Sequence, residues 1–239
     1  MKIALILGVT GKIGMAIARR LIKEGYNVIG SSHRNELPAG SFPEDRLTLH
    51  HLDMEKIESI DSFLDEIKDI EEIEFFTNTV SNTLILEKFE KIERSVFENE
   101  FRINLFNYAY FLQKIIPKMK SDSNVIFILS EMVINPQKNF SPYISSKYAL
   151  LGLMKCLTEE FAPEKIRFNA ISPSKMDTNF QWKINLNGKM VYVPNAIKEK
   201  QLKTQKFLSP DKVAEKIISI IKNKSINGQN FIIKDEDRN

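Results

Sequence analysis

Short apolar runs alternate along this chain with longer segments in which apolar residues recur every three or four positions. The short runs are typical of parallel strands buried on both faces, and the longer period is typical of amphipathic helices. Strands are predicted at residues 2–7, 27–30, 47–52, 73–77, 124–129, 166–171 and 231–233. Helices are predicted after residues 8–14, around 57–67, across 89–119, from 143 to about 161 and around 210–221. The alternation predicts an α/β fold of the Rossmann type, a doubly wound parallel sheet with helices on both faces.

The first predicted strand leads directly into a glycine turn at residues 8–14, with the sequence GVTGKIG. The following helix ends at Gly25, so that a strand, a glycine turn, a helix and a second strand fall within about 30 residues, as in a dinucleotide-binding fingerprint. Gly8 would allow the tight turn, Gly11 would let backbone amides approach a pyrophosphate, and Gly14 would permit close packing of helix on strand. The alternative is a structural turn that binds no ligand.

Composition narrows the class of protein. The chain has 239 residues, of which 43% are hydrophobic and 27% charged, as expected for a globular protein of one domain. The formal net charge is +3, with basic and acidic residues interspersed, so we expect no nucleic-acid partner. No apolar run approaches the roughly 18 residues that a membrane span needs. The single cysteine, Cys156, is expected to be a small core residue in a reducing compartment, which predicts a cytoplasmic protein without a membrane partner.

Tyr143 and Lys147 are a candidate catalytic pair, because they stand one helical turn apart and project from one face of the predicted helix. A free tyrosine has a pKa of about 10, and a neighbouring ammonium favours the phenolate and lowers that pKa. Ser130 directly follows the strand at 124–129, which places its hydroxyl at the carboxyl end of the sheet, where open α/β folds bind ligands. Taken alone, the tyrosine and lysine also fit an amphipathic pair on a solvated face.

The glycine turn, Ser130 thirteen residues before Tyr143, and the spacing of Tyr143 and Lys147 together resemble the short-chain dehydrogenase/reductase family. The resemblance covers nearly the whole chain and is to the short single-domain branch, which includes the 3-oxoacyl-carrier-protein reductases. It implies a single dinucleotide-binding catalytic domain over residues 1–239 and a sheet with strand order 3-2-1-4-5-6-7. It also implies reversible hydride transfer between NADP(H) and a carbonyl/alcohol pair.

The resemblance assigns a role to each catalytic side chain. Tyr143 would protonate the developing alkoxide, and Ser130 would donate a hydrogen bond to the same oxygen. Lys147 would lower the pKa of Tyr143 and hold the nicotinamide ribose. The segment around Asn104 resembles the one that carries the family's asparagine, which holds a water in the proton relay behind the lysine. The alternative for Asn104 is a buried, hydrogen-bonded asparagine with a structural role.

The cofactor contacts implied by the resemblance follow the carboxyl ends of the strands. They are Gly8, Thr10, Gly11, Lys12, Ile13, Gly14, His33, Arg34, Asp53, Asn78, Tyr143, Lys147, Pro173 and Thr178. NADP(H) is preferred to NAD(H), because His33 and Arg34 stand where an acidic residue would bind the free ribose hydroxyl of NAD. A solvated Arg34 is the alternative, and NAD(H) stays open. No metal site is expected, because the adjacent His50 and His51 face opposite sides of a strand.

Residues 179–208 lack clear periodicity and, by position, form the substrate lid. Their lysines could attract an anionic small-molecule carbonyl substrate, such as a carrier-protein thioester or a nucleotide sugar, although a solvated face explains them equally well. The resemblance further implies a homodimer or homotetramer, in which the helix that starts at Tyr143 and the helix bearing Asn104 pack against their copies.

Three segments depart from the pattern of the short branch. The glycines at 8–14 are spaced as in the extended branch, whose members act on nucleotide sugars. Relatives read Asn-Asn-Ala-Gly where this chain has residues 78–81, so only Asn78 is kept, and Ser174 replaces a glycine. These departures leave two alternatives to a ketoreductase, namely a nucleotide-sugar epimerase or dehydratase and a non-catalytic NADP-binding regulator.

Overall fold

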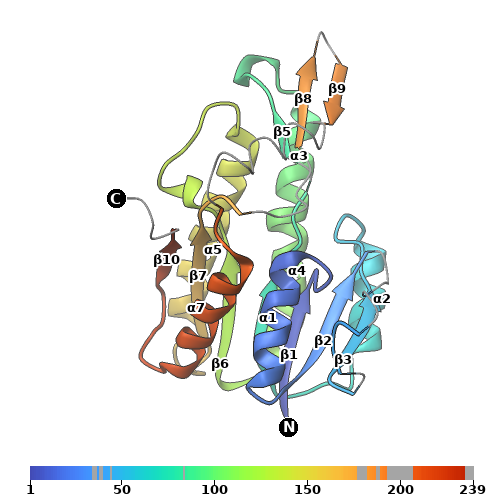
Figure 1. Cartoon of the computed structure of the whole chain (residues 1–239), viewed down its shortest axis with the longest axis vertical. Coiled ribbons are helices and arrows are strands. Elements are labelled where there is room, and N and C mark those ends of the chain that lie inside the picture. Colours follow the sequence, from blue (N-terminus) through green and yellow to red (C-terminus); the bar gives the residue numbers. More distant parts are fainter. Residues whose placement is uncertain are drawn as a thin grey trace.

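Seven parallel strands form one sheet, and their carboxyl ends all lie along the same edge (Figure 1). The computed structural model describes residues 1–33, 37, 40–43, 45–82, 84–176, 182–186, 189–192 and 207–234. The strands are β1 (Lys2–Leu7), β2 (Tyr26–Ser32), β3 (Leu47–His51), β4 (Ile73–Asn78), β6 (Met119–Ile128), β7 (Arg167–Pro173) and β10 (Asn230–Ile233). Their spatial order is β3-β2-β1-β4-β6-β7-β10, which is 3-2-1-4-5-6-7 when these seven strands are counted along the chain. The predicted fold and strand order are confirmed.

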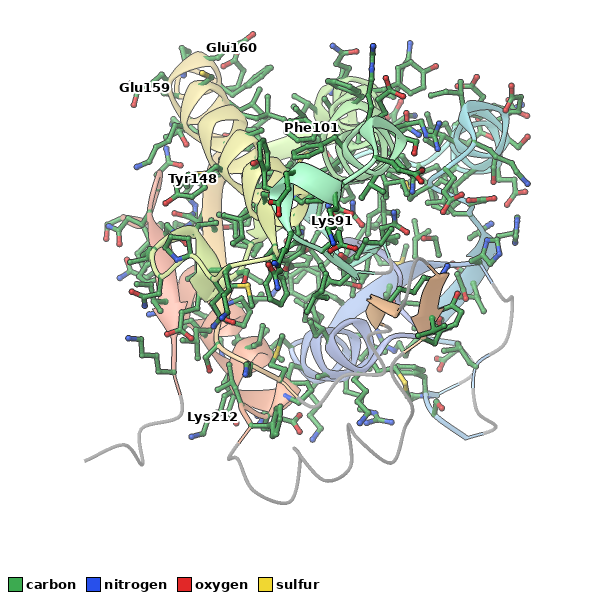
Figure 2. The ribbon with its side chains drawn as sticks, turned by 90° about the horizontal axis from the view of Figure 1, so that it is seen from above. Lys91, Phe101, Tyr148, Glu159, Glu160 and Lys212 are labelled. Carbon is green, nitrogen blue, oxygen red and sulfur yellow. The ribbon has the colours of Figure 1, made fainter. Side chains whose placement is uncertain are left out.

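Helices cover both faces of this sheet (Figure 1, Figure 2). The first face packs against α1 (Lys12–Lys23) and α7 (Pro210–Lys222), and the second against α2 (Ile57–Glu66), α4 (Asn107–Ile115) and α5 (Ser141–Glu160). Side chains of β1 alternate between the two layers, because Ala4 and Ile6 belong to the first core and Leu5 and Leu7 to the second. Across the described part of the chain, no helix is long and apolar enough to cross a membrane.

The helix predicted across residues 89–119 is divided into several pieces. They are η1 (Phe89–Lys91), α3 (Arg94–Phe101), the π-helical turn η2 (Arg102–Phe106), α4, and η3 (Ile116–Lys118). A π-helical turn disturbs the regular hydrogen-bond ladder and is frequent at functional sites. Asn104 lies in the middle of η2 and is 3% exposed.

A second, three-stranded sheet joins the segment after β4 to part of the predicted lid. It contains β5 (Leu84–Leu86), β8 (Trp182–Leu186) and β9 (Lys189–Tyr192), in the order β5-β8-β9. The sheet stands beyond the carboxyl edge of the large sheet (Figure 1). The hairpin of β8 and β9 was not predicted, and residues 179–181, 187, 188 and 193–206 of the predicted lid lie outside the described residues. The lid role of 179–208 stays a prediction.

Cys156 does not pack in the core, so that prediction is wrong. The side chain is free and exposed on α5, whereas Leu150 and Met154 on the same helix are buried. Two residues advance an α-helix by about 200°, so Cys156 points away from the face on which Met154 packs.

Candidate active site

The predicted site residues gather because neighbouring strands end at the same edge of the sheet. Leu7 at the end of β1 pairs with Asn78 at the end of β4, and Asn78 pairs in turn with Phe127 of β6. Ser130 lies two residues beyond the end of β6, and Pro173 ends β7, the next strand across. One edge of the sheet therefore carries the glycine turn, Asn78, Ser130 and Pro173 side by side.

Gly8, Gly11 and Gly14 form a turn, here called the glycine cradle, in which Gly8 and Gly14 leave no space for a side chain. Gly8 has φ +77°, a conformation that L side chains rarely adopt. A Cβ on Gly14 would lie 2.5 Å from the Gly8 carbonyl oxygen and 2.8 Å from Val9 Cα. Gly11 has no side chain to cap α1, so the positive end of that helix is open to an anion. These features fit the pyrophosphate of a dinucleotide.

The altered segment after β4 packs directly against this cradle. The Thr79 hydroxyl lies 2.8 Å from the Leu7 carbonyl oxygen and 3.0 Å from that of Gly8, and can donate to either. The Asn78 side-chain oxygen accepts a 2.9 Å hydrogen bond from the Val80 amide. A Cβ on Gly8 would lie 2.9 Å from the Thr79 hydroxyl oxygen. Thr79 therefore braces the turn.

Residues at the end of β2 form the predicted ribose-binding side of the site. The Ser31 hydroxyl accepts a 3.2 Å hydrogen bond from the Gly8 amide, and the Ser32 hydroxyl lies 2.9 Å from that of Thr10. Both serines are buried, whereas the His33 side chain is 70% exposed. Of the described residues at the end of β2, none is acidic, and Arg34 lies outside the described residues.

Asp53 stands between the side chains of Lys56 and His33 beside β2. Its carboxylate lies 3.3 Å from the Lys56 ammonium and 4.0 Å from the His33 ring nitrogen Nδ1. Burial favours the protonated carboxyl, but a hydrogen bond from the Glu55 amide and the charges of Lys56 and His33 outweigh burial and lower the pKa of Asp53. Asp53 is therefore ionised at neutral pH with its charge balanced.

Ser130 and Tyr143 meet at the carboxyl end of β6. The Ser130 hydroxyl accepts a 3.2 Å hydrogen bond from the Met132 amide and caps the short helix η4 (Glu131–Val133). Burial raises the pKa of Tyr143 to about 12, although a hydrogen bond with Ser130 acts in the opposite direction. The prediction that Lys147 would leave Tyr143 with a lowered pKa is therefore wrong for this structure, because burial outweighs the other contributions.

Lys147 lies beneath the Tyr143 ring. Its ammonium nitrogen is 5.6 Å from the ring centre and donates a 3.1 Å hydrogen bond to the Ile128 carbonyl oxygen. The residue is 5% exposed, and burial lowers the pKa of Lys147 to about 8, while the negative charge of Glu100 partly opposes that change. The charge of Glu100 therefore affects the protonation of Lys147, a predicted catalytic residue.

Asn104 connects Glu100 to α5. Its side-chain nitrogen Nδ2 donates to Glu100 Oε1 at 2.5 Å and to the Ser146 hydroxyl at 3.0 Å. Ser146 in turn donates to the Tyr143 carbonyl oxygen at 2.8 Å. Figure 2 shows α5 and the helical segment that carries Phe101 lying alongside each other. Glu100, Asn104, Tyr143, Ser146 and Lys147 are called the buried polar network below.

Sequence reasoning missed two members of this network, Glu100 and Ser146. Glu100 was recognisable as a charged residue one helical turn before Asn104, on the face that buries Ile103 and Asn107. The predicted set is otherwise placed as follows: Lys12 and Ile13 start α1, Pro173 ends β7, and Thr178 lies outside the described residues.

An apolar cluster borders Tyr143 on the side of the small sheet. Leu84, Phe140 and Ile144 are buried there, and Leu86, Met132 and Tyr143 pack against them. Because β5 supplies Leu84 and Leu86, the small sheet contributes directly to the wall beside the phenol.

The chain is similar to known proteins over most of its length. The sequence model of the family described as short chain dehydrogenase matches residues 2–189. Human dehydrogenase/reductase SDR family member 4 is 30% identical over 195 residues, which cover 75% of this chain and 67% of that protein. The 3-oxoacyl-[acyl-carrier-protein] reductase FabG of Buchnera aphidicola is 27% identical over 231 residues, covering 93% of this chain and 90% of that protein.

The fold is also similar to a solved structure, the 3-ketoacyl-(acyl-carrier-protein) reductase from Brucella melitensis complexed with NADH. The TM-score is 0.79 at 20% identity, with 97% of this chain and 96% of that chain covered. At this identity the likeness establishes the fold alone.

Proposed function

The chain belongs to the short-chain dehydrogenase/reductase family, and on that basis we propose that it is an NADP(H)-dependent ketoreductase acting on a small-molecule carbonyl/alcohol pair. The observation that supports this most is the meeting of Ser130, Tyr143 and Lys147 at the sheet edge that also carries the glycine cradle. A nicotinamide cofactor, when bound, supplies or accepts the hydride.

Tyr143 is the proposed proton donor in the reducing direction. With a pKa of about 12 the phenol is fully protonated at neutral pH and can give its proton to the oxygen of the substrate as negative charge develops there. Ser130, which hydrogen-bonds with Tyr143, would donate to the same oxygen and stabilise that charge. Both groups are held in place beforehand, Ser130 by its capping bond and Tyr143 by the apolar cluster.

Lys147 and Asn104 would help Tyr143 to regain its proton after each turnover. The Lys147 ammonium stabilises the phenolate left after proton transfer, because opposite charges attract strongly in a buried setting. Lys147 would also hold the nicotinamide ribose, and Asn104 would orient the polar groups through which the proton is replaced. The cradle of Gly8, Gly11 and Gly14 would hold the pyrophosphate.

NADP(H) is the proposed cofactor in preference to NAD(H). Support comes from Ser31, Ser32 and His33, which offer no carboxylate to a free ribose hydroxyl, and from Lys56, which balances the charge of Asp53. Arg34 would add a second cation to a 2′-phosphate. The specificity constants measured with NADPH and with NADH for one substrate test this choice, and a larger value with NADH would contradict it.

A panel of carbonyl compounds tests the proposed reaction. NADPH oxidation would be followed with acyl thioesters, nucleotide ketosugars and small ketones. The panel includes anionic compounds, because the lysines of residues 179–208 would attract an anionic substrate. Turnover of a member of the panel is the expected result. The glycine spacing favours an epimerase or dehydratase as second candidate, which would be purified with bound cofactor and would consume no NADPH.

A homodimer or homotetramer is proposed as the assembled state. Within the described residues, a groove of about 740 Å³ lies between α4 and α5 and is lined by Leu112, Ile116, Leu153, Leu157 and Phe161. An apolar groove of this kind fits the equivalent helices of a second copy. Light scattering of the purified protein should give the mass of a dimer or tetramer, and a monomeric mass would contradict the proposal.

A further inference from the structure

Glu100 is a buried carboxyl group to which the proposed reaction has so far given no role. It lies in the last turn of α3, four residues before Asn104, and is 4% exposed. Removing a carboxylate from water is strongly unfavourable unless charges or hydrogen bonds compensate, so its partners indicate what it does. An apolar side chain would suit this buried face of the helix equally well if only packing mattered.

The hydrogen bonds around Glu100 fix the orientation of the Asn104 amide. Ser146 donates its single hydroxyl hydrogen to the Tyr143 carbonyl oxygen, so its oxygen can only accept from Asn104. An ionised Glu100 can likewise only accept, and both bonds therefore require the Nδ2 side of the amide. The Asn104 oxygen is then directed to the other side, whereas a protonated Glu100 could donate to that oxygen and favour the flipped amide.

Glu100 also supplies a negative charge opposite Lys147. The element packed against α3 on this side is α5, and its titratable groups at this place are Tyr143 and Lys147. Glu100 raises the pKa of both groups. The pKa of Glu100 is itself raised, because burial outweighs the opposing effects of the Lys147 charge and of the hydrogen bond from Asn104. The ammonium form of Lys147 therefore depends on two partners, the Ile128 carbonyl oxygen and the charge of Glu100.

We propose that Glu100 is a positioning residue of the proton relay, whose carboxylate orients the Asn104 amide and keeps Lys147 in its charged form. This inference rests on the proposed ketoreductase function, because the relay serves the recovery of Tyr143. Glu100 acts through Asn104 and Lys147 and does not touch the reacting atoms. The π-helical turn η2 follows Glu100 closely and contains Asn104, so the two side chains reach α5 from adjoining segments.

Two measurements on the full-length protein test the role of Glu100. The first is the titration of Lys147 by NMR with lysine isotope-labelled at Cε, the Lys147 signal being assigned by its loss in Lys147→Arg. The second is the pH profile of kcat for NADPH oxidation with acetoacetyl-coenzyme A. Glu100→Gln keeps the shape and removes the charge, and Glu100→Asp keeps the charge. Glu98→Gln is the matched control, because Glu98 lies on the same helix and is exposed.

In Glu100→Gln, the titration midpoint of Lys147 should fall from about 8 by about one pH unit, and the alkaline decline of kcat should move with it. Glu100→Asp should return both toward the values of the unchanged protein, and Glu98→Gln should leave both unaltered. A purely structural Glu100 would lower kcat or stability without moving the midpoint, and that result overturns the proposal. Since the midpoint is read without turnover, it tests Glu100 independently of the reaction. A protein that oxidises no NADPH with any member of the carbonyl panel rejects the ketoreductase function separately.

Discussion

The glycine cradle and the buried polar network lie at the same edge of the sheet but are built in different ways. The cradle consists of backbone groups, and its fit depends on the lack of side chains at Gly8 and Gly14. The network consists of side chains whose charges and hydrogen bonds depend on one another across α3, η2 and α5. Damage to the cradle should therefore reduce stability and cofactor binding together, whereas loss of the Tyr143 hydroxyl from the network should reduce turnover and leave the cofactor bound.

Tyr143→Phe should give the largest separation of turnover from binding. Loss of the donated proton should lower kcat by about 10²- to 10⁴-fold, while the dissociation constant of NADPH, measured by fluorescence titration, stays nearly unchanged. Tyr148→Phe is the matched control, because Tyr148 lies on the same helix and is 47% exposed. Equal kcat in Tyr143→Phe and the unchanged protein would contradict the role of the phenol.

Ser130→Ala should lower kcat by about 10²-fold, because one hydrogen bond to the developing charge is lost. The same change removes the cap of η4 and should cost about 1 kcal/mol of unfolding free energy. Ser209→Ala removes the comparable cap of α7 and isolates that second effect. If both variants retain full kcat in steady-state assays, Ser130 does not act on the substrate.

Gly14→Ala should damage the glycine cradle, and should therefore reduce stability and cofactor binding. Its Cβ would meet backbone atoms of Gly8 and Val9, which cannot move aside, so we expect a loss of about 1–3 kcal/mol of unfolding free energy and weaker NADPH binding. Gly152→Ala in α5 meets nothing within 4 Å and should leave the thermal midpoint equal or higher. Unchanged melting and NADPH affinity in Gly14→Ala would show that the turn tolerates a side chain.

Lys56→Ala should have the smallest effect of these changes, and it tests the choice between NADPH and NADH at the rim of the cofactor site. Without its 3.3 Å partner, the Asp53 carboxylate would repel a 2′-phosphate, and the ratio of specificity constants for NADPH and NADH should fall by about 3- to 10-fold. Lys68→Ala removes an equally spaced pair with Asp65 away from the site and is the control. An equal ratio in both variants would exclude Lys56 from cofactor choice.

The fold could be predicted from local pattern because most strands of the large sheet contain a short apolar run. Except between β2 and β3, where the described residues contain no helix, at least one helix separates each strand of this sheet from the next along the chain. The small sheet could not be predicted from local pattern, because β5 pairs with β8 across about a hundred residues and each strand is short. The cradle was predictable because its chemistry depends on the spacing of glycines along the chain.

The network was only partly predictable, because burial decides its chemistry. The spacing of Tyr143 and Lys147 identified the pair, but the raised pKa of Tyr143 and the participation of Glu100 follow from desolvation and from the packing of α3 on α5. The spacing predicted that Lys147 lowers the pKa of Tyr143, whereas in the structure burial raises that pKa.

Deuterium transfer from the cofactor to the product would show hydride transfer by this protein itself. NADPH carrying deuterium on the hydride-donating carbon would be incubated with the carbonyl panel, and mass spectrometry would detect deuterium on the carbinol carbon of the alcohol product. We expect deuterated alcohol with the unchanged protein and with Tyr148→Phe, and a strongly reduced yield with Tyr143→Phe. No deuterated product from any carbonyl, or an equal yield from Tyr143→Phe, would contradict this expectation.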